Sequence, residues 1–546
     1  MTGTQILKIR DQLRAVRAPL KGHWEDLSQL FMPFRINSGT DVPDIPSAEA
    51  VNDSTGRTVA LILANGLASL VIPREEIWFE WNPPKEFEKD DVWVRAYRNA
   101  SVTAREFIER SNFYEEAQEF LIEGPVFGTS NLFVGDVEDE DVLYFRQQPI
   151  DTYDIAEDAR GRVNTVGRDL RLTPEQAAKE FGADKLPRNI SNKIGKPEGL
   201  TEKSCYYHLV LPAMEQADAD APDKDKKPWR SWVVEETSKM VVQSGGFDEF
   251  PFAVHRYRRF GRSPWGFGPG STGIADARQL DFLERLADAA AEKSVFPPLE
   301  ADSSLEGEVA QGALEINYVD RQKGETVRAM DTGVRYDFAK DRLADKRDQL
   351  RKVFHVDLFQ LFSQRAAERA PLTATEANLV SGEKLTQFSP VFGRLVSEFL
   401  TPVLTRVFGI LLRRGFLPEI QALVTEKGVP APEIRYKNRI MLAMQQRSNQ
   451  SLMDFVNLTA PIVQADPTCM DPINIPNVIR DTARNAGFGE DWIRSKKEVE
   501  AIQAQRADAQ QKQQQAELAA SMAKTGKDLS ASTPEVREGL AARIQP

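Results

Sequence analysis

The spacing of apolar residues predicts three long helices in the first part of the chain. Apolar side chains recur at intervals of three and four residues over residues 5–32, 53–72 and about 90–122. Pro33 and Pro73 are expected to end the first two helices, and Asp53 or Ser54 is expected to cap the second.

Short apolar runs between and after these helices predict strands. They cover Ile77–Trp81, Leu132–Val134, Leu143–Phe145, Tyr206–Leu211 and Trp229–Glu235. The mixture of helices and strands indicates an α+β N-terminal half.

The second half of the chain is dominated by longer helical patterns. A helix is expected over 274–295, ended by Pro297 and Pro298, and another over 336–353. The residues between them have a strand-like composition, for example Val327–Met330. The pattern therefore predicts a rod of two helices that carries a small β insertion.

A third helical pattern in this half covers 373–414. Thr373 and Glu376 form a capping box at its start, and Pro390 and Pro402 are expected to kink it.

The C-terminal part is expected to be helical over 431–500. Residues 503–515 form a Gln/Ala-rich run, and 520–546 contain few large apolar residues. We expect this tail to be frayed, or ordered only against neighbouring chains.

Composition excludes several classes of protein. The 546 residues allow three to four structural units, and Cys205 and Cys469 are too few for a disulfide scaffold or a cysteine-based zinc cluster. The formal net charge is −12, opposite to that of a protein that wraps nucleic acid tightly. The N-terminus lacks the apolar run of a signal peptide, and the stretch 59–72 is too short to span a bilayer, so we expect no membrane association.

Three motifs are similar to known catalytic or ligand-binding motifs, and each also has a purely structural interpretation. Gly268–Gly273 satisfies the spacing of a dinucleotide-binding loop, but no strand precedes it, so a glycine corner that allows close packing is favoured. Asp136–Asp141 lacks the glycine and glutamate of a calcium loop, which favours a solvated turn. Ser263 lacks the second glycine of a nucleophile elbow, and the four histidines are scattered.

Two basic segments are open to two interpretations each. Arg256–Arg262 interleaves arginines with aromatic residues, as a strand that lies on phosphates does, but its arginines could instead pair with the many acids. Residues 337–352 mix lysine and arginine with aspartate at helical spacing, which is typical of a solvated face or of pairing between adjacent helices.

Several blocks taken together resemble the head-to-tail connecting (portal) proteins of short-tailed, T7-like bacteriophages. They keep the same order over nearly the full length: Trp24–Pro33, Asp53–Pro73, Trp78–Phe79, Ser111–Tyr114, Gly261–Pro264, Lys293–Pro298, Phe354–Phe359, Leu372–Glu376, Leu400–Pro402, Leu411–Pro418 and Arg494–Val499. The chain departs from the pattern at Ala370-Pro371, where the proline would stiffen the loop before the capping box.

The resemblance implies an α+β, mostly helical portal fold that assembles as a ring, with a dodecamer expected. Its regions would be a wing body (1–273), stem helices (274–296 and 336–354), a β-rich clip (297–335), a channel loop (355–372), a kinked wing helix (373–430), a helical crown (431–502) and the tail (503–546). In the channel loop, Gln360, Gln364, Arg365 and Arg369 are candidate DNA contacts, or they pair with Glu368 or a neighbouring subunit.

The resemblance also implies a function and partners. The ring would sit at one capsid vertex of the virion, assembled in the bacterial cytoplasm, as the conduit for packaging and ejection of double-stranded DNA. Terminase would dock on the clip, tail adaptor or nozzle proteins would replace it, and coat and scaffolding proteins would contact the wing. No catalytic residue, cofactor or metal is expected. The alternatives are another ring of the phage neck, or a nucleotide-binding enzyme that uses Gly268–Gly273.

Overall fold

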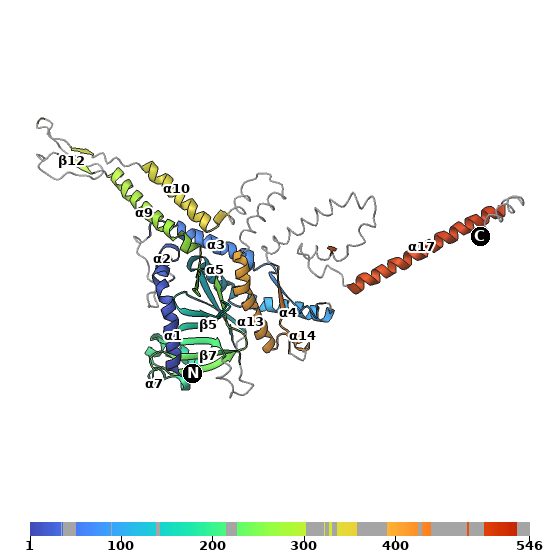
Figure 1. Ribbon diagram of the computed structural model, residues 1–546, viewed down its shortest axis with the longest axis horizontal. Coiled ribbons are helices and arrows are strands. Elements are labelled where there is room, and N and C mark those ends of the chain that lie inside the picture. Colours follow the sequence, from blue (N-terminus) through green and yellow to red (C-terminus); the bar gives the residue numbers. More distant parts are fainter. Residues whose placement is uncertain are drawn as a thin grey trace. The chain divides into compact units, whose positions relative to one another are not determined.

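The computed structural model describes most of the chain in two separate units. The described residues are 1–33, 35, 51–88, 90–137, 142–213, 227–296, 298–301, 322, 327–329, 336–357, 390–423, 428–437, 478–479 and 496–531. The units are Met1–Met444 and Gln445–Pro546. The elements from α1 to β14 belong to the first unit, and α17 belongs to the second (Figure 1).

The N-terminal helical run is divided in two by a proline. Helix α1 (Gly3–Arg17) is followed by the 3₁₀ turn η1 (Ala18–Leu20) and by α2 (Lys21–Phe31). The sequence predicted one helical pattern over 5–32. Pro19, which lies in η1, has no N–H to donate, and its ring disfavours a continuous α-helix.

Helix α3 (Thr55–Val71) lies within the predicted bounds and follows Asp53, whose Oδ1 accepts a hydrogen bond of 2.7 Å from the N–H of Thr55. The predicted helix over 90–122 is instead two helices, α4 (Asp91–Arg110) and α5 (Phe113–Phe127). Ser111 breaks it, with extended backbone (ψ 175°) and a hydroxyl that accepts from the N–H of Phe113.

Two antiparallel sheets form the β part of the body. The first has the strand order β3-β2-β9, with β2 (Thr129–Asp136), β3 (Leu143–Gln148) and β9 (Phe252–Arg256). The second runs β4-β5-β6-β7-β8, with β4 (Tyr153–Glu157), β5 (Val163–Leu172), β6 (Ser204–Pro212), β7 (Trp229–Glu235) and β8 (Val241–Phe247). The short helices α6 (Pro174–Phe181), α7 (Arg188–Ser191) and α8 (Pro197–Thr201) connect β5 to β6.

A small sheet joins residues that lie far apart in the sequence. Strand β1 (Phe79–Asn82) pairs antiparallel with β14 (Glu433–Tyr436), so that Phe79 lies opposite Tyr436. The prediction of helix from residue 431 onward is therefore wrong over Glu433–Tyr436. The local pattern could not show this, because the partner strand lies about 350 residues earlier.

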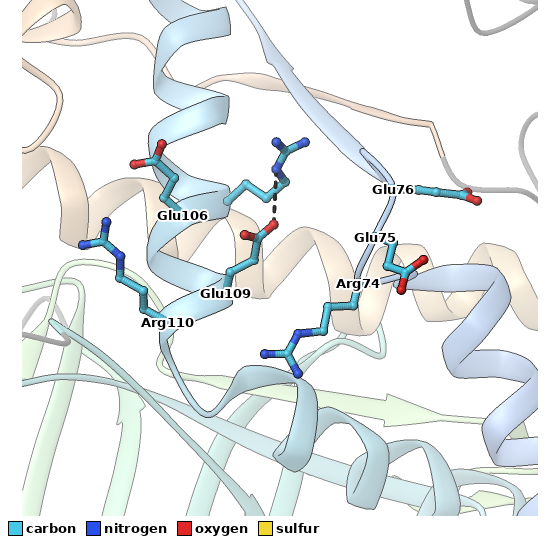
Figure 2. Close-up of a pocket in the computed structure, with 7 residues that line it drawn as sticks. Arg74, Glu75, Glu76, Glu106, Glu109 and Arg110 are labelled. Carbon is cyan, nitrogen blue, oxygen red and sulfur yellow. Dashed lines mark ion pairs between the residues drawn. The ribbon is translucent and has the colours of Figure 1, made fainter.

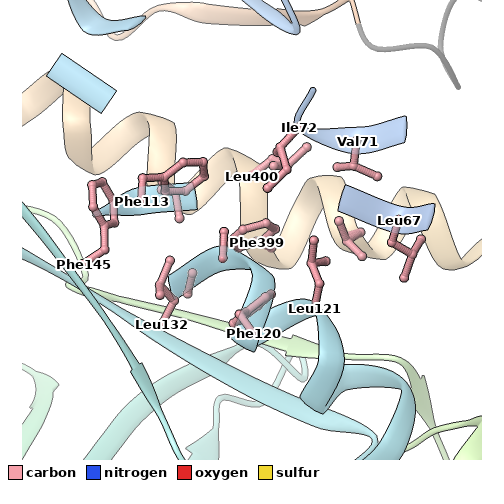
Figure 3. Close-up of a cluster of buried hydrophobic side chains, with 14 of the residues drawn as sticks. Leu67, Val71, Ile72, Phe113, Phe120, Leu121, Leu132, Phe145, Phe399 and Leu400 are labelled. Atoms are coloured by element: carbon pink, nitrogen blue, oxygen red, sulfur yellow. The ribbon is translucent and has the colours of Figure 1, made fainter. Parts of the chain in front are cut away.

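The main core forms where a helix from later in the first unit packs against α3 and α5. This helix runs over Pro390–Arg413 and contains the π-helical turn η5 (Val396–Leu400) before α13 (Thr401–Arg413). Figure 3 shows Phe399 against Phe120, and Leu67 and Val71 on the adjoining α3. The ring centroids of Phe399 and Phe120 are 4.2 Å apart. Residues 373–389 of the predicted helix lie outside the described residues.

Of the two prolines that were expected to kink the helix, Pro402 follows this π turn, and Pro390 is the first described residue of the helix. The N–H of Thr401 donates to the carbonyl of Val396, five residues earlier. Pro402 lacks an N–H and would clash with the carbonyl of Glu398 in a regular helix, and the widened turn relieves both problems.

The same helix is long and apolar enough to cross a membrane by length and composition. In the structure its side chains are core residues: Val403, Leu404, Val407, Ile410 and Leu411 are each at most 1% exposed. Packing inside the protein therefore accounts for its apolar character.

Helix α9 (Pro269–Val295) and helix α10 (Tyr336–Val353) lie side by side, and the strands β12 (Leu299–Ala301) and β13 (Val327–Ala329) pair antiparallel beyond their ends (Figure 1). The predicted rod with a β insertion is confirmed for these residues. Helix α9 begins five residues earlier than predicted, and α10 has the predicted bounds.

In the second unit, α17 (Lys496–Ala531) is a single helix of 36 residues. Leu518 and Met522 are 58% and 70% exposed. The helix is continuous over 503–531, so the first of the two expectations, a frayed tail, is wrong there, and ordering against neighbouring chains stays a prediction. Alanine and glutamine are good helix formers, which explains why the helix persists.

Candidate functional site: the α9–α10 rod and its base

The rod is held together by a narrow apolar seam and by ion pairs between its helices. Leu280 of α9 and Leu343 and Leu350 of α10 are buried. Lys346 Nζ lies 2.7 Å from Asp276 Oδ1, and Arg347 pairs with Glu284. The mixed charges of α10 therefore pair at least in part with the adjacent helix, which was one of the two predicted interpretations.

The base of the rod is anchored to α2 and α3. Arg347 Nη2 lies 2.9 Å from Asp53 Oδ2, and the Asp53 side chain is only 5% exposed. His23 Nε2 is 2.9 Å from Ser271 Oγ, and burial lowers the pKa of His23. The rings of Phe31 and Phe354 are 5.2 Å apart. Both helices of the rod are thus fixed where they enter the body.

The glycine-rich segment Gly268–Gly273 serves this anchoring. Gly268 is the N-cap of α9, and an added Cβ there would lie 2.2 Å from the carbonyl oxygen of Pro125. A Cβ on Gly270 would lie 2.3 Å from the carbonyl oxygen of Val126. The end of α5 therefore packs directly against these glycines, which confirms the close-packing interpretation. The prediction that no strand precedes them is wrong, because the two-residue strand β11 (Gly266–Phe267) ends just before Gly268; it pairs antiparallel with the strand Arg258–Arg259 and does not belong to a βαβ unit.

The segment Arg256–Arg262 divides into paired and exposed arginines. Arg256 is 2% exposed and lies 2.8 Å from Glu157 and 2.6 Å from Glu398. Arg259 lies 3.0 Å from Glu157. The ion-pair interpretation is confirmed for these two residues, whereas Arg258, Phe260 and Arg262 are exposed.

A buried polar cluster in the body was not predicted from the sequence. Glu123 is fully buried, and its Oε1 accepts a 2.7 Å hydrogen bond from Arg35 Nε. Burial raises the pKa of Glu123 to about 7, against the stabilising charge of Arg35. Burial likewise raises the pKa of Asp154 to about 6 beside Arg17 and Arg14. A glutamate within the apolar run Phe120–Val126 was the available signal.

The remaining catalytic candidates have structural roles. The hydroxyl of Ser263 accepts from the N–H of Trp265, and Asp136 lies 2.8 Å from Arg414. Within the described ranges no group of three histidine, cysteine, aspartate or glutamate side chains is placed to hold a metal ion. Residues 138–141 of the candidate calcium loop lie outside those ranges.

A hollow of about 620 Å³ lies between α4 and the segment after α3 (Figure 2). Three arginines and four glutamates line it: Arg74, Glu75, Glu76, Arg105, Glu106, Glu109 and Arg110. Arg105 lies 3.4 Å from Glu109. Side chains of both signs line the hollow together, so their charges largely offset one another.

The candidate DNA contacts Gln360, Gln364, Arg365 and Arg369 lie outside the described residues, as do most of the clip segment 297–335 and most of the crown segment 431–502. These assignments remain predictions.

Comparisons with known proteins identify the class of protein that this body and rod define. The family model for the bacteriophage head to tail connecting protein matches residues 3–493. The chain therefore belongs to this family, and it is a portal protein. The predicted resemblance and the predicted portal fold class are thereby confirmed.

Two curated relatives agree over almost their whole lengths. The chain is 26% identical to the portal protein of Salmonella phage epsilon15, covering 98% of this chain and 97% of the relative. It is 25% identical to the probable portal protein of Bordetella phage BPP-1, covering 93% and 91%.

Two solved structures that the chain resembles are particles of a gene transfer agent. One is the virion of the native particle (11% identity, TM-score 0.33, covering 81% of this chain and 90% of that chain). Another is the neck of the empty particle (12% identity, TM-score 0.34, covering 72% and 85%).

Proposed function

We propose that copies of this portal protein close into a ring, expected to be a dodecamer, at one vertex of the phage capsid. The observation that carries this proposal is the α9–α10 rod, which projects from the body, is tied to it by Asp53 and Arg347, and bears the β12–β13 hairpin. A rod of two helices buries only a narrow seam by itself, and side-by-side copies would cover more of it.

Within this ring, α9 and α10 are the stem, 297–335 the clip and 355–372 the channel loop. Gln360, Gln364, Arg365 and Arg369 would reach the DNA from that loop. The wing consists of residues 1–273 and 373–430. The crown consists of residues 431–502, and the tail of residues 503–546.

The charge of the chain fits a conduit through which DNA slides. Each copy contributes a formal −12, so the assembled ring repels a polyanion overall. Many phosphate contacts would instead hold the duplex in place in a salt-dependent way. The proposal therefore requires few DNA contacts, made by long polar side chains.

The proposed partners act in sequence on different regions. A terminase ATPase docks on the clip during packaging, and tail adaptor or nozzle proteins replace it afterwards. Coat and scaffolding proteins contact the wing while the virion is assembled in the host cytoplasm. The ring itself supplies no catalytic step.

Light scattering and negative-stain imaging of the purified protein test the proposal. The expected result is a closed, broad-winged ring with a narrow stem. A lone protomer that persists at high concentration would contradict the proposal. A small ring with a short stem would instead support a different ring of the phage neck.

A further inference from the structure

The exposed part of Arg256–Arg262 forms the tip of a small hairpin. Strand β10 (Arg258–Arg259) pairs antiparallel with β11 (Gly266–Phe267), which places Arg258 opposite Phe267. The turn between them contains Phe260, Gly261 and Arg262, and Gly261 adopts a φ of +61°. This left-handed backbone conformation of Gly261 makes the turn sharp, and the flanking Phe260 and Arg262 side chains extend toward solvent.

Two arginines of this hairpin are free of the ion pairs that occupy their neighbours. Arg256 and Arg259 share Glu157. Arg258 and Arg262 are exposed, and neither forms an ion pair with a carboxylate among the residues that the structure describes. In a chain with 82 acidic and 70 basic residues, exposed arginines that form no ion pair with a described acid are available to an external anion.

An aromatic side chain stiffens the same tip. Phe260 is 61% exposed, yet its ring packs edge-on against Phe267 at a centroid distance of 5.7 Å. Phe267 immediately precedes Gly268, the cap of α9. The tip is therefore fixed to the base of the rod.

The hairpin also lies beside the end of α10. The start of α9, which follows the hairpin directly, packs against this end, because a Cβ on Gly273 would lie 3.5 Å from Val353 Cγ1 and 3.7 Å from Phe354 Cε2. Burial and the charge of Arg258 lower the pKa of His355, and the charge of Asp357 raises it. The N–H of His355 donates to the carbonyl of Lys352 at 3.1 Å. Lys352 and Asp357 are both exposed here, so this end of the helix carries a further cation and one anion. The chain continues from here into the segment assigned to the channel loop.

We propose that Arg258 and Arg262 contact the phosphate backbone of double-stranded DNA in the channel, next to the channel loop. This inference rests on the proposed function. A guanidinium matches two phosphate oxygens at once and carries no base specificity, which suits a duplex that must move past. Pairing with acidic residues of a second copy is the competing role of the same arginines.

A salt titration of duplex binding by the purified ring tests this inference. The variant R258Q/R262Q is compared with R95Q/R110Q, which removes the same charge from two exposed arginines of α4. The probe is a fluorescently labelled 40-base-pair duplex, measured by anisotropy between about 20 and 200 mM salt. The expected result is a several-fold weaker Kd for R258Q/R262Q at low salt. The slope of log K against log salt should become shallower by about 0.9 for each phosphate that the variant no longer neutralises.

The controls separate the outcomes. R95Q/R110Q should bind like the wild type, and R258K/R262K should keep most of the salt slope, because lysine retains the charge. Equal binding by R258Q/R262Q and the wild type, equal weakening in both double variants, or no duplex binding by the wild-type ring would overturn the inference. Rings that fall apart only in R258Q/R262Q would assign the arginines to the interface between copies. Failure of the wild type to form rings would instead refute the proposed function.

Discussion

The carboxylate of Asp53 joins a helix cap to the guanidinium of Arg347. Its Oδ1 accepts from the N–H of Thr55 at 2.7 Å, and its Oδ2 accepts from Arg347 Nη2 at 2.9 Å. Arg347 also reaches Glu284 on α9. One buried carboxylate thus fixes the start of α3 and the position of both rod helices.

Substitutions of Asp53 should separate these two roles. Asn at this position keeps an oxygen for the cap but loses the charge, so D53N should destabilise the fold by about 1–2 kcal/mol. D53A loses the cap as well and should cost about 1 kcal/mol more. Calorimetric melting at a fixed protein concentration measures both. Equal melting temperatures of D53N and D53A would show that the cap contributes nothing.

Adding a methyl group at Gly270 should prevent α9 from packing. The new Cβ of G270A would lie 2.3 Å from the carbonyl oxygen of Val126, so the end of α5 has to move, and we expect a loss of about 2 kcal/mol or more. G22A is the matched control, because a Cβ on Gly22 of α2 meets nothing within 4 Å and alanine favours a helix. A neutral G270A would refute the packing role of this glycine.

Glu123 should make the fold less stable as the pH rises. Its pKa is about 7 in the folded chain and near 4.5 when unfolded, so the folded chain holds an extra proton between these values. The contribution of Glu123 to the free energy of unfolding is fully present below pH 4.5. It falls by on the order of 3 kcal/mol as the pH rises to 7. Melting curves from pH 4.5 to 8 should therefore fall more steeply for the wild type than for E123Q, which does not titrate. Parallel curves would contradict this assignment.

The channel-loop assignment makes a prediction about packaging. Replacing Arg365 and Arg369 with glutamate should leave ring assembly intact, because it changes only the proposed DNA-facing charges, while DNA packaging or retention should be impaired. Imaging checks assembly, and the amount of encapsidated DNA checks packaging. Normal packaging by the double variant would show that the loop is placed wrongly.

The clip assignment predicts where the motor binds. Deleting about 300–330 should abolish docking of the terminase ATPase, since those residues are the proposed docking surface at the end of the rod. Co-sedimentation of the ATPase with wild-type and deleted rings measures this. Unchanged co-sedimentation, with rings still formed, would move the docking surface elsewhere.

The spacing of apolar residues along the chain was sufficient to predict those elements whose bounds depend on nearby residues. The bounds of α10 and α3 followed from periodicity and flanking breakers, and the β insertion followed from composition. The break at Ser111 was missed because the apolar period continues across it, although its hydroxyl competes for the backbone. Strand β14 was missed because its partner is distant in sequence.

The site was predictable only in outline. Both interpretations of Arg256–Arg262 were available from the sequence, but Glu157 and Glu398, which decide between them, come from β4 and from the helix before α13. The pairing of Arg35 with Glu123 was equally hidden, because it depends on how α5 packs and not on residue spacing.

The π turn at Val396–Leu400 absorbs one residue more than a regular turn of helix, because the N–H of Thr401 reaches back five residues and not four. Removing one residue within the turn would therefore leave Val391, Phe392 and Leu395, which are at most 5% exposed, in their places in the core. It would, however, bring back the clash between Pro402 and the carbonyl four residues earlier. Homologous chains that lack a proline at this position should therefore be able to dispense with the extra residue, whereas chains that keep the proline should keep it.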